Sequence, residues 1–257
     1  ISCGDGTDIT ALTVSFNITG NNVNCGDTLT SSRTLPTDVM GCSSNNFITL
    51  SGNNTVFDCD GYTIQGEANS AINLGTGSTN NTIKNCNINL NGTTSKNGIL
   101  GYRANNLTVQ NNTINVSTHH AIYLSLRSSN STIQGNNIFG DSSTPLIYLL
   151  NEPFNITIRD NNITEGDRYS IRYYNGSKHN HILNNTIISS QYGIQLFSGT
   201  YNSTIENNTV TCSVNYCIEI RSNASENTVF NNTLINGGYS LSLHTNVTKT
   251  TLYNNTI

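Results

Sequence analysis

Apolar residues recur along this chain at a fixed interval, and that interval constrains the fold more than any other feature. Aligning residues 81–88, 107–114 and 131–138 gives three columns of Ile, Val and Leu, repeating every 23 to 27 residues. The first column holds Ile83, Val109, Ile133, Ile158, Ile182, Ile205, Val229 and Leu252; the second Ile88, Ile114, Ile138, Ile163, Ile187, Val210, Leu234 and Ile257; the third Ile72, Ile99, Ile122, Ile147, Ile171, Ile194, Ile218 and Leu241. Such repetition is typical of a solenoid.

The columns predict three short strands in every coil of about 24 residues. The segments around them are rich in β-branched residues and are separated by turn residues, not by helical patterns. Each strand then pairs in parallel with its equivalent one coil later, and the inward Ile residues stack along the axis. We expect an all-β parallel solenoid of about nine coils, whose first coil lies around Val56 and Ile64.

Small polar residues are abundant, with 45 Asn, 35 Thr and 28 Ser in 257 residues. Part of this excess has a fixed place three residues after each first-column residue: Asn112, Asn136, Asn161, Asn185, Asn208, Asn232 and Asn255. Side-chain amides stacked in this way can bond to their own turn and to the amides above and below. We therefore predict a structural asparagine ladder that has no catalytic role.

Seven cysteines and a single methionine favour an oxidising compartment. Cys212 and Cys217 flank a short loop and form a candidate disulfide. Cys59 and Cys86 fall on adjacent rungs of the ladder position, which allows either a disulfide or two stacked buried thiols. The pairing of Cys3 stays open. Because the chain begins at Ile1 without a leader-like segment, we expect a mature, exported protein.

Charge and hydropathy exclude some partners. A net charge of −4 gives no basic footprint for nucleic acid, and no apolar run is long enough for a transmembrane segment. N-glycosylation sequons are dense, and covalent N-glycans are the expected partners. Either the sites are glycosylated, or the fold's need for Asn and Thr creates the motif. The sequons begin at Asn17, Asn53, Asn80, Asn91, Asn106, Asn111, Asn115, Asn130, Asn155, Asn162, Asn175, Asn184, Asn202, Asn207, Asn223, Asn231, Asn246 and Asn254.

The repeats resemble the right-handed parallel β-helix repeats of the pectin-lyase-like superfamily, particularly those of carbohydrate-binding proteins and sugar hydrolases. Residues 58–66, Asp-Cys-Asp-Gly-Tyr-Thr-Ile-Gln-Gly, also resemble the first coil of secreted archaeal and bacterial β-helix proteins. The resemblance implies a right-handed β-helix over residues 45–257. It makes residues 1–44 an N-terminal cap held by a disulfide between Cys25 and Cys42.

The resemblance does not carry a recognisable active site. Hydrolases of the superfamily have clustered Asp residues with His-Gly and Arg-x-Lys motifs, which are absent here. The outward positions of the third-column strands include one carboxylate, Glu219, which cannot build a hydrolase or lyase site alone. No catalytic residue, metal site or cofactor is therefore predicted. A catalytic alternative needs loop carboxylates to converge, and the candidates are Asp141, Glu152, Glu165 and Asp167.

The same outward positions gather aromatic and arginine side chains that are otherwise sparse. They are Tyr102, Tyr123, Tyr148, Arg172, Tyr174, Phe197 and Arg221, and we call them the aromatic face. Such a surface can stack on sugar rings or pack against a protein. The alternative is that aromatic residues occur here because they favour strands.

Two functions follow from these observations. The first is an extracellular, N-glycosylated surface protein with a structural or interaction role, as a coat, adhesin or filament subunit. Its copies could associate laterally, or head to tail, because the sequence ends partway through a coil at Ile257. The alternative is a polysaccharide-binding or polysaccharide-degrading protein that uses the aromatic face.

Overall fold

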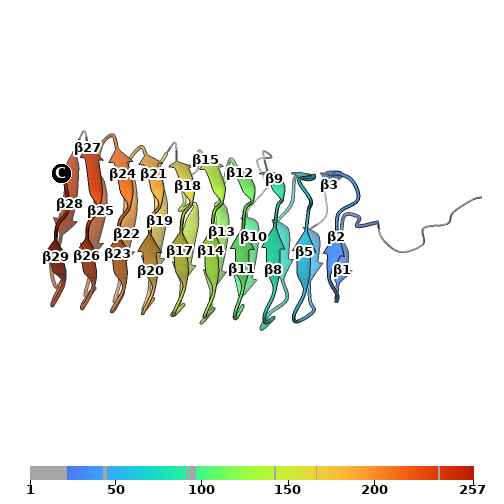
Figure 1. Cartoon of the computed structure of the whole chain (residues 1–257), viewed down its shortest axis with the longest axis horizontal. Coiled ribbons are helices and arrows are strands. Elements are labelled where there is room, and N and C mark those ends of the chain that lie inside the picture. Colours follow the sequence, from blue (N-terminus) through green and yellow to red (C-terminus); the bar gives the residue numbers. More distant parts are fainter. Residues whose placement is uncertain are drawn as a thin grey trace, which may run out of the picture.

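The computed structural model describes residues 22–42, 45–90, 92, 97–141, 143–165, 167–236 and 238–257. These residues form a rod of stacked coils, with β1 and β2 near one end and β28 and β29 at the other (Figure 1). The described strands make nine coils of three strands and two strands of a further coil. This arrangement confirms the predicted all-β parallel β-helix.

Three parallel sheets run along the rod, and strands adjacent in a sheet come from successive coils. Sheet A consists of β1 (Asp27–Leu29), β4 (Asn46–Leu50), β7 (Ser70–Leu74), β10 (Asn97–Tyr102), β13 (His120–Ser125), β16 (Ile147–Leu150), β19 (Tyr169–Tyr174), β22 (Tyr192–Phe197), β25 (Tyr216–Arg221) and β28 (Tyr239–Leu243). Sheet B consists of β2 (Arg33–Thr34), β5 (Val56–Asp58), β8 (Thr82–Lys84), β11 (Thr108–Gln110), β14 (Thr132–Gln134), β17 (Thr157–Arg159), β20 (His181–Leu183), β23 (Thr204–Glu206), β26 (Thr228–Phe230) and β29 (Thr251–Tyr253). Sheet C consists of β3 (Val39–Cys42), β6 (Thr63–Gly66), β9 (Asn87–Leu90), β12 (Thr113–Val116), β15 (Asn137–Gly140), β18 (Asn162–Glu165), β21 (Thr186–Ser189), β24 (Thr209–Cys212) and β27 (Thr233–Asn236).

The apolar columns line the interior of the rod. Third-column residues pair along sheet A, first-column residues along sheet B and second-column residues along sheet C. In the coil around residue 57 the inward residue differs from the sequence prediction. Phe57 pairs with Ile83 and is fully buried, whereas Val56 is exposed. The three-residue spacing between the first column and the ladder position pointed to Val56 instead. In this coil Cys59 follows the inward residue Phe57 by two residues, whereas Cys86 follows Ile83 by three.

The asparagine ladder runs through the turns between sheets B and C. The Oδ1 atom of Asn136 accepts hydrogen bonds from the backbone N–H and the Nδ2 of Asn112, each at 2.9 Å. The Nδ2 of Asn136 donates to the Val109 carbonyl at 3.0 Å and to Asn161 Oδ1 at 2.9 Å. The same pattern continues from Asn161 to Asn255. Each buried amide therefore joins its coil to both neighbours, and Asn185, Asn208 and Asn232 also donate to a carbonyl of their own coil.

Six cysteines pair in the described part of the chain, as Cys25–Cys42, Cys59–Cys86 and Cys212–Cys217. Cys59 and Cys86 lie on adjacent rungs with Cα atoms 4.7 Å apart, so the disulfide takes the place of two ladder asparagines. Three disulfides indicate an oxidising, non-cytoplasmic compartment. Cys3 lies outside the described residues.

Strands β1, β2 and β3 lie within the segment that the sequence assigns to the cap, residues 1–44, and pair with β4, β5 and β6. Leu29, Leu35 and Val39 are buried there and extend the core by one coil. Among the described residues, no helix has the length and apolar character needed to span a membrane.

Candidate functional site

All seven residues of the aromatic face lie on the outer side of sheet A. Tyr123, Tyr148 and Arg172 occupy one outward row of directly paired residues. Tyr174, Phe197 and Arg221 occupy the row two residues further along the strands, where Tyr102 also lies. The period of two along each strand turns these side chains outward while Ile99, Ile122 and their equivalents point inward.

The rings of the aromatic face contact one another from coil to coil, edge to face between Tyr102 and Tyr123 and stacked between Tyr123 and Tyr148. Ring centroids are 5.9 Å apart between Tyr102 and Tyr123, 5.6 Å between Tyr123 and Tyr148, and 6.5 Å between Tyr148 and Tyr174. Phe197 stacks on Tyr174 with a centroid distance of 5.1 Å. The rings therefore form one continuous strip across five coils. Burial raises the pKa of the Tyr123 and Tyr148 hydroxyls, so both stay neutral hydrogen-bonding groups near neutral pH.

Arginines lie over the rings at the C-terminal half of this strip. The guanidinium carbon of Arg172 is 5.1 Å from the ring centroids of both Tyr174 and Phe197, and that of Arg221 is 5.3 Å from Phe197. These cation–π contacts place both guanidinium groups among the rings of the strip.

A second aromatic row on sheet A was not recognised in the sequence. Tyr169, Tyr192, Tyr216 and Tyr239 pair directly in consecutive coils, with centroid distances of 4.7, 6.0 and 5.3 Å. Arg172 lies between the two rows, 4.9 Å from the Tyr169 centroid. The row occurs two residues before the third apolar column, so extending the column comparison by two positions would have found it. This second row therefore lies near the amino ends of the sheet A strands, where its rings also contact Arg172 and His244.

Glu219 lies in the same outward row as Tyr123, Tyr148 and Arg172 and is fully buried. Its Oε1 atom is 3.0 Å from His244 Nε2 and 3.3 Å from the Arg221 guanidinium, and its Oε2 atom accepts a hydrogen bond from Gln195. The sequence predicted the outward position of this carboxylate but not its burial. The burial arises from the long side chains around it. The paired carboxylate fixes the orientation of Arg221 and His244.

At the other end of the strip, His120 packs between two tyrosines. Its ring centroid is 5.1 Å from that of Tyr123 and 5.0 Å from that of Tyr148. Its Nδ1–H donates to the Pro145 carbonyl at 2.5 Å. Burial lowers the pKa of His120 to about 4, so this imidazole is uncharged near neutral pH. His120 therefore extends the stacked surface without adding charge.

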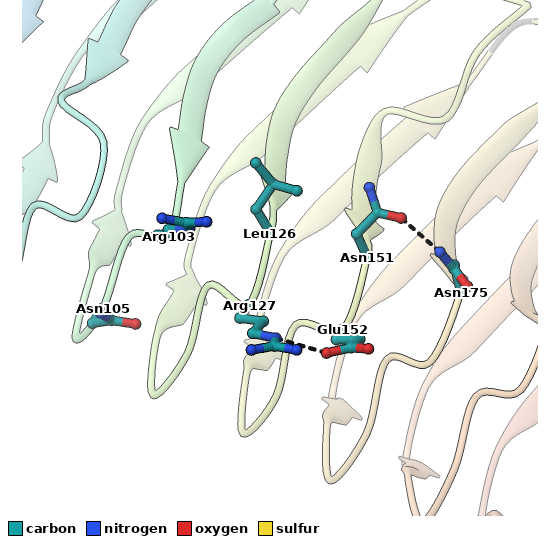
Figure 2. A pocket seen from close by; sticks show the side chains of 7 residues that line it. All are labelled: Arg103, Asn105, Leu126, Arg127, Asn151, Glu152 and Asn175. Carbon is teal, nitrogen blue, oxygen red and sulfur yellow. Dashed lines mark hydrogen bonds and ion pairs between the residues drawn. The ribbon is translucent and has the colours of Figure 1, made fainter.

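A pocket borders the aromatic face at the carboxyl ends of its strands (Figure 2). We call it the edge pocket, and it is lined by Arg103, Asn105, Leu126, Arg127, Asn151, Glu152 and Asn175. Arg103 directly follows Tyr102, and Asn175 directly follows Tyr174. Arg127 Nε lies 2.8 Å from Glu152 Oε2, and Asn175 Nδ2 donates to Asn151 Oδ1 at 2.6 Å. The sequence did not predict this group, because its residues come from separate turns. Glu152 was considered only as a loop carboxylate, and Asn175 only as a sequon.

The four loop carboxylates do not converge. Glu165 and Asp167 are neighbours, with Asp167 N–H donating to Glu165 Oε1 at 2.9 Å. Glu152 belongs to the edge pocket, and Asp141 lines a shallow hollow beside Asn115 and Phe139 on the sheet C side. In the part of the chain that the structure describes, no group of three or more His, Cys, Asp or Glu residues could hold a metal ion.

The sequons are distributed over the turns and strand ends of the rod. Asn17 and Asn91 lie outside the described residues, and the other sixteen sequon asparagines are all exposed. Several of them hydrogen-bond along the rod; Asn106 Nδ2 donates to Asn80 Oδ1 at 2.8 Å, and Asn155 Nδ2 donates to Asn130 Oδ1 at 2.8 Å. These bonds join amides of successive coils on the outside of the rod.

Known proteins with this architecture include enzymes that act on polysaccharides. The periplasmic alginate epimerase AlgG, solved as a point mutant, superposes with a TM-score of 0.71 at 15% identity; the match covers 89% of this chain and 60% of that one. The A-module of a mannuronan C-5 epimerase from Azotobacter vinelandii gives a TM-score of 0.54 at 16% identity, covering 88% and 78%. DFA-IIIase from Arthrobacter chlorophenolicus, solved without its lid, gives a TM-score of 0.52 at 10% identity. That match covers 86% of this chain and 67% of DFA-IIIase.

At these identities the likeness shows the fold alone, and the chain spans about 60% of the length of AlgG. No curated protein matches the sequence significantly. The family model described as "Right handed beta helix region" matches residues 38–187 and 97–257. Those two matches cover most of the chain and agree with the coil pattern and with the handedness expected from the repeats. The chain belongs to the right-handed β-helix family.

Proposed function

We propose that this protein binds an extended polysaccharide along the outer side of sheet A. The observation that carries the proposal is the continuous strip of ring contacts from Tyr102 to Phe197, with the tyrosine row and the arginines beside it. Pyranose rings present apolar faces that pack on aromatic rings, and their hydroxyls bond to charged groups beside them. Successive rings spaced by one coil suit a repeating polymer.

Strand propensity alone does not account for this surface. The aromatic residues are concentrated on sheet A, where Tyr123, Tyr148 and Tyr174 are only partly buried. Arg172 lies among these rings, and none of the ion pairs found among the described residues includes it. The polysaccharide-modifying enzymes among the structural neighbours support the same class of ligand.

An exported, N-glycosylated surface protein is compatible with this proposal. All sixteen described sequon asparagines are exposed, which favours glycan attachment. Under this proposal the protein acts outside the cytoplasm, as a surface adhesin that holds polysaccharide. Head-to-tail or lateral association of copies remains a prediction from the sequence.

The test is affinity electrophoresis in gels containing polygalacturonate, alginate or dextran. We expect at least one polysaccharide to retard the wild-type protein. The combined variant Tyr123→Ala/Tyr148→Ala/Arg172→Ala should lose most of that retardation, because it removes the centre of the strip. A matched control, Phe230→Ala/Tyr253→Ala, removes the stacked ring pair on the outer side of sheet B and should leave retardation unchanged. Equal retardation of the combined variant and the wild type would contradict the proposal.

A further inference from the structure

Two adjoining shallow hollows lie on the outer side of sheet C, a different sheet from the one that carries the aromatic face. Their volumes are about 430 and 510 Å³, which is within the size range of small-molecule sites. Asn115 and Phe139 line both of them, and we call the pair the sheet C hollows. Of the residues that line them, only Asp141 is charged. The rest of the lining consists of amides, hydroxyls and apolar groups, which suits an uncharged ligand that carries hydroxyls.

Phe139 is the only aromatic residue in the nine described strands of sheet C. It is partly buried, and no ring or cation contacts its phenyl group among the described residues. The exposed part of the ring is therefore available to a ligand in the hollows. The other residues of its outward row are amides, threonines and isoleucines: Gln65, Asn89, Asn115, Thr164, Ile188, Thr211 and Ile235.

Asn115 is the only sequon asparagine in that row, and it pairs directly with Phe139 in the adjacent strand. Both side chains point outward, because the next residues toward the N-terminus, Ile114 and Ile138, are buried in the core. Adjacent strands are about 4.8 Å apart, so the two outward side chains lie side by side. A sugar linked to the Asn115 Nδ2 atom therefore leaves the sheet beside the phenyl ring.

The amide of Asn115 is free to carry a glycan. Several other sequon asparagines use Nδ2 within the rod, as Asn106 does when it donates to Asn80 Oδ1. Asn115 is exposed, and none of the hydrogen bonds found among the described residues involves its side chain. Its neighbours in the row, Asn89 and Phe139, do not begin sequons, so no glycan stands beside it in that row. Attachment at Asn115 therefore breaks no described hydrogen bond and is not crowded from the adjacent coils of its row.

Asn89 adds a polar group on the other side of Asn115. It lines the first hollow, and its Oδ1 atom is buried without a hydrogen-bond partner among the described residues. Such an atom lowers stability until it is paired. Rotation of this amide toward the hollow would let a sugar hydroxyl or an N-acetyl N–H group donate to it. The sugar linked to Asn115 thus has an aromatic surface on one side and a hydrogen-bond acceptor on the other.

We propose that the sheet C hollows bind the protein's own N-glycan, and that the first sugar attached to Asn115 packs on the Phe139 ring. The apolar face of a pyranose ring is the surface that packs on an aromatic side chain. This rests on the N-glycosylation included in the proposed function and is independent of polysaccharide binding to sheet A. It makes Asn115 a sequon whose glycan stabilises the folded rod.

The test is a double-mutant cycle on protein secreted from a eukaryotic cell line, with every N-glycan trimmed enzymatically to one N-acetylglucosamine. Glycopeptide mass spectrometry should find Asn115 occupied. Asn115→Gln should lower the Tm by roughly 2 to 4 °C, because it removes the sugar and its contact with the ring. In the Phe139→Thr background, which copies Thr164 of the next coil, the same change should leave the Tm within error. The same variants made in a bacterial periplasm without N-glycosylation should show no loss from Asn115→Gln.

Asn162→Gln is the matched control, because it removes a sequon from the outer side of sheet C where the paired residues are Asn137 and Thr186. Its effect on the Tm should be the same with and without Phe139→Thr. An unoccupied Asn115, a Tm that Asn115→Gln leaves unchanged, or equal losses from that change in the two backgrounds would overturn the proposal. An equal loss in the unglycosylated protein would also overturn it.

The polysaccharide gels separate this proposal from the proposed function. Asn115→Gln and Phe139→Thr lie on sheet C, so the gels should retard both variants as they retard the wild type. Failure of the Tm cycle with normal retardation would overturn the glycan site alone. Loss of retardation in the aromatic-face variant is measured without reference to the sheet C hollows.

Discussion

One buried side chain inside the rod, that of Tyr173, lowers the stability of the protein. Tyr173 is fully buried on β19, between Leu149 and Leu196 of the adjacent coils, and its hydroxyl has no hydrogen-bond partner among the described residues. Burial raises the pKa of this hydroxyl well above the usual value for tyrosine, so it is neutral. A buried polar atom without a partner costs about 1 to 3 kcal/mol.

Tyr173→Phe should therefore stabilise the protein. Removing only the hydroxyl leaves the ring packing unchanged and relieves the desolvation cost, so the free energy of unfolding should rise by about 1 kcal/mol. Scanning calorimetry should show a Tm higher by roughly 2 to 4 °C. Tyr174→Phe, whose hydroxyl is on the partly exposed outer side, should leave the Tm within error. A lower Tm for Tyr173→Phe would mean that the hydroxyl has an undescribed partner.

His120 should make the protein sensitive to acid. Its folded-state pKa is about 4, below the value of 6.5 for a free histidine, so the unfolded chain binds more protons between these pH values. The stability contributed by the neutral ring is complete above about pH 6.5 and is lost as the pH falls toward 4. The pKa difference corresponds to a loss of up to about 3 kcal/mol.

The measurement is urea unfolding at pH 7 and pH 4.5 for the wild type and for His120→Phe. The phenyl ring keeps the stack with Tyr123 and Tyr148 but cannot take a proton. Both proteins share all other titrating groups, so the variant should lose less stability between the two pH values. Identical losses in the two proteins would show that His120 does not titrate as described.

At the scale of elements, the asparagine ladder adds buried side-chain hydrogen bonds to the strand pairs that join successive coils. Asn161→Ala removes the acceptor of two N–H groups of Asn136 and the donor to Asn185 and to the Ile133 carbonyl. Because these groups are buried, we expect a loss of about 3 kcal/mol or more in urea unfolding. Asn255→Ala is the matched control. It removes the same bonds to Asn232 in a partly exposed rung, where water can replace them, so its effect should be smaller. Equal losses would contradict this role of burial.

Strand positions and the ladder could be predicted because each depends on residues at one repeating interval. The predictions failed where the repeat interval between columns changes, or where side chains from different turns come together. A turn shorter by one residue placed Phe57 inward instead of Val56. The edge pocket could not be predicted because Arg103, Arg127 and Glu152 come from three different turns. Their equivalence appears only when the coils are aligned by the isolated bridges between those turns. The burial of Glu219 could not be predicted because it depends on two other side chains. His244 lies on the next coil, and Arg221 lies two residues further along the same strand.

At the scale of the whole molecule, the spacing of coils limits glycan attachment. Asn207, Asn231 and Asn254 occupy one exposed column in successive coils. Neighbouring strands are about 4.8 Å apart, which is less than the width of a glycan. We expect glycopeptide mass spectrometry of the protein from its natural source to find partial occupancy at these three sites. Full occupancy of all three on the same molecules would contradict the expectation.

The rod also brings distant residues into one long surface. Tyr102 and Arg221 are separated by 119 positions in the sequence, yet they belong to the same row of sheet A. A rigid parallel β-helix holds such a row straight because every coil is fixed to its neighbours by three sheets. Binding a stiff polymer to a preformed surface costs little ordering of the protein.

A crystal structure of the protein with bound hexagalacturonate tests this account most directly. The account predicts sugar rings packed on Tyr123, Tyr148 and Tyr174 of the aromatic face. A hexasaccharide bound on sheet B or sheet C, with the outer side of sheet A empty, would contradict it.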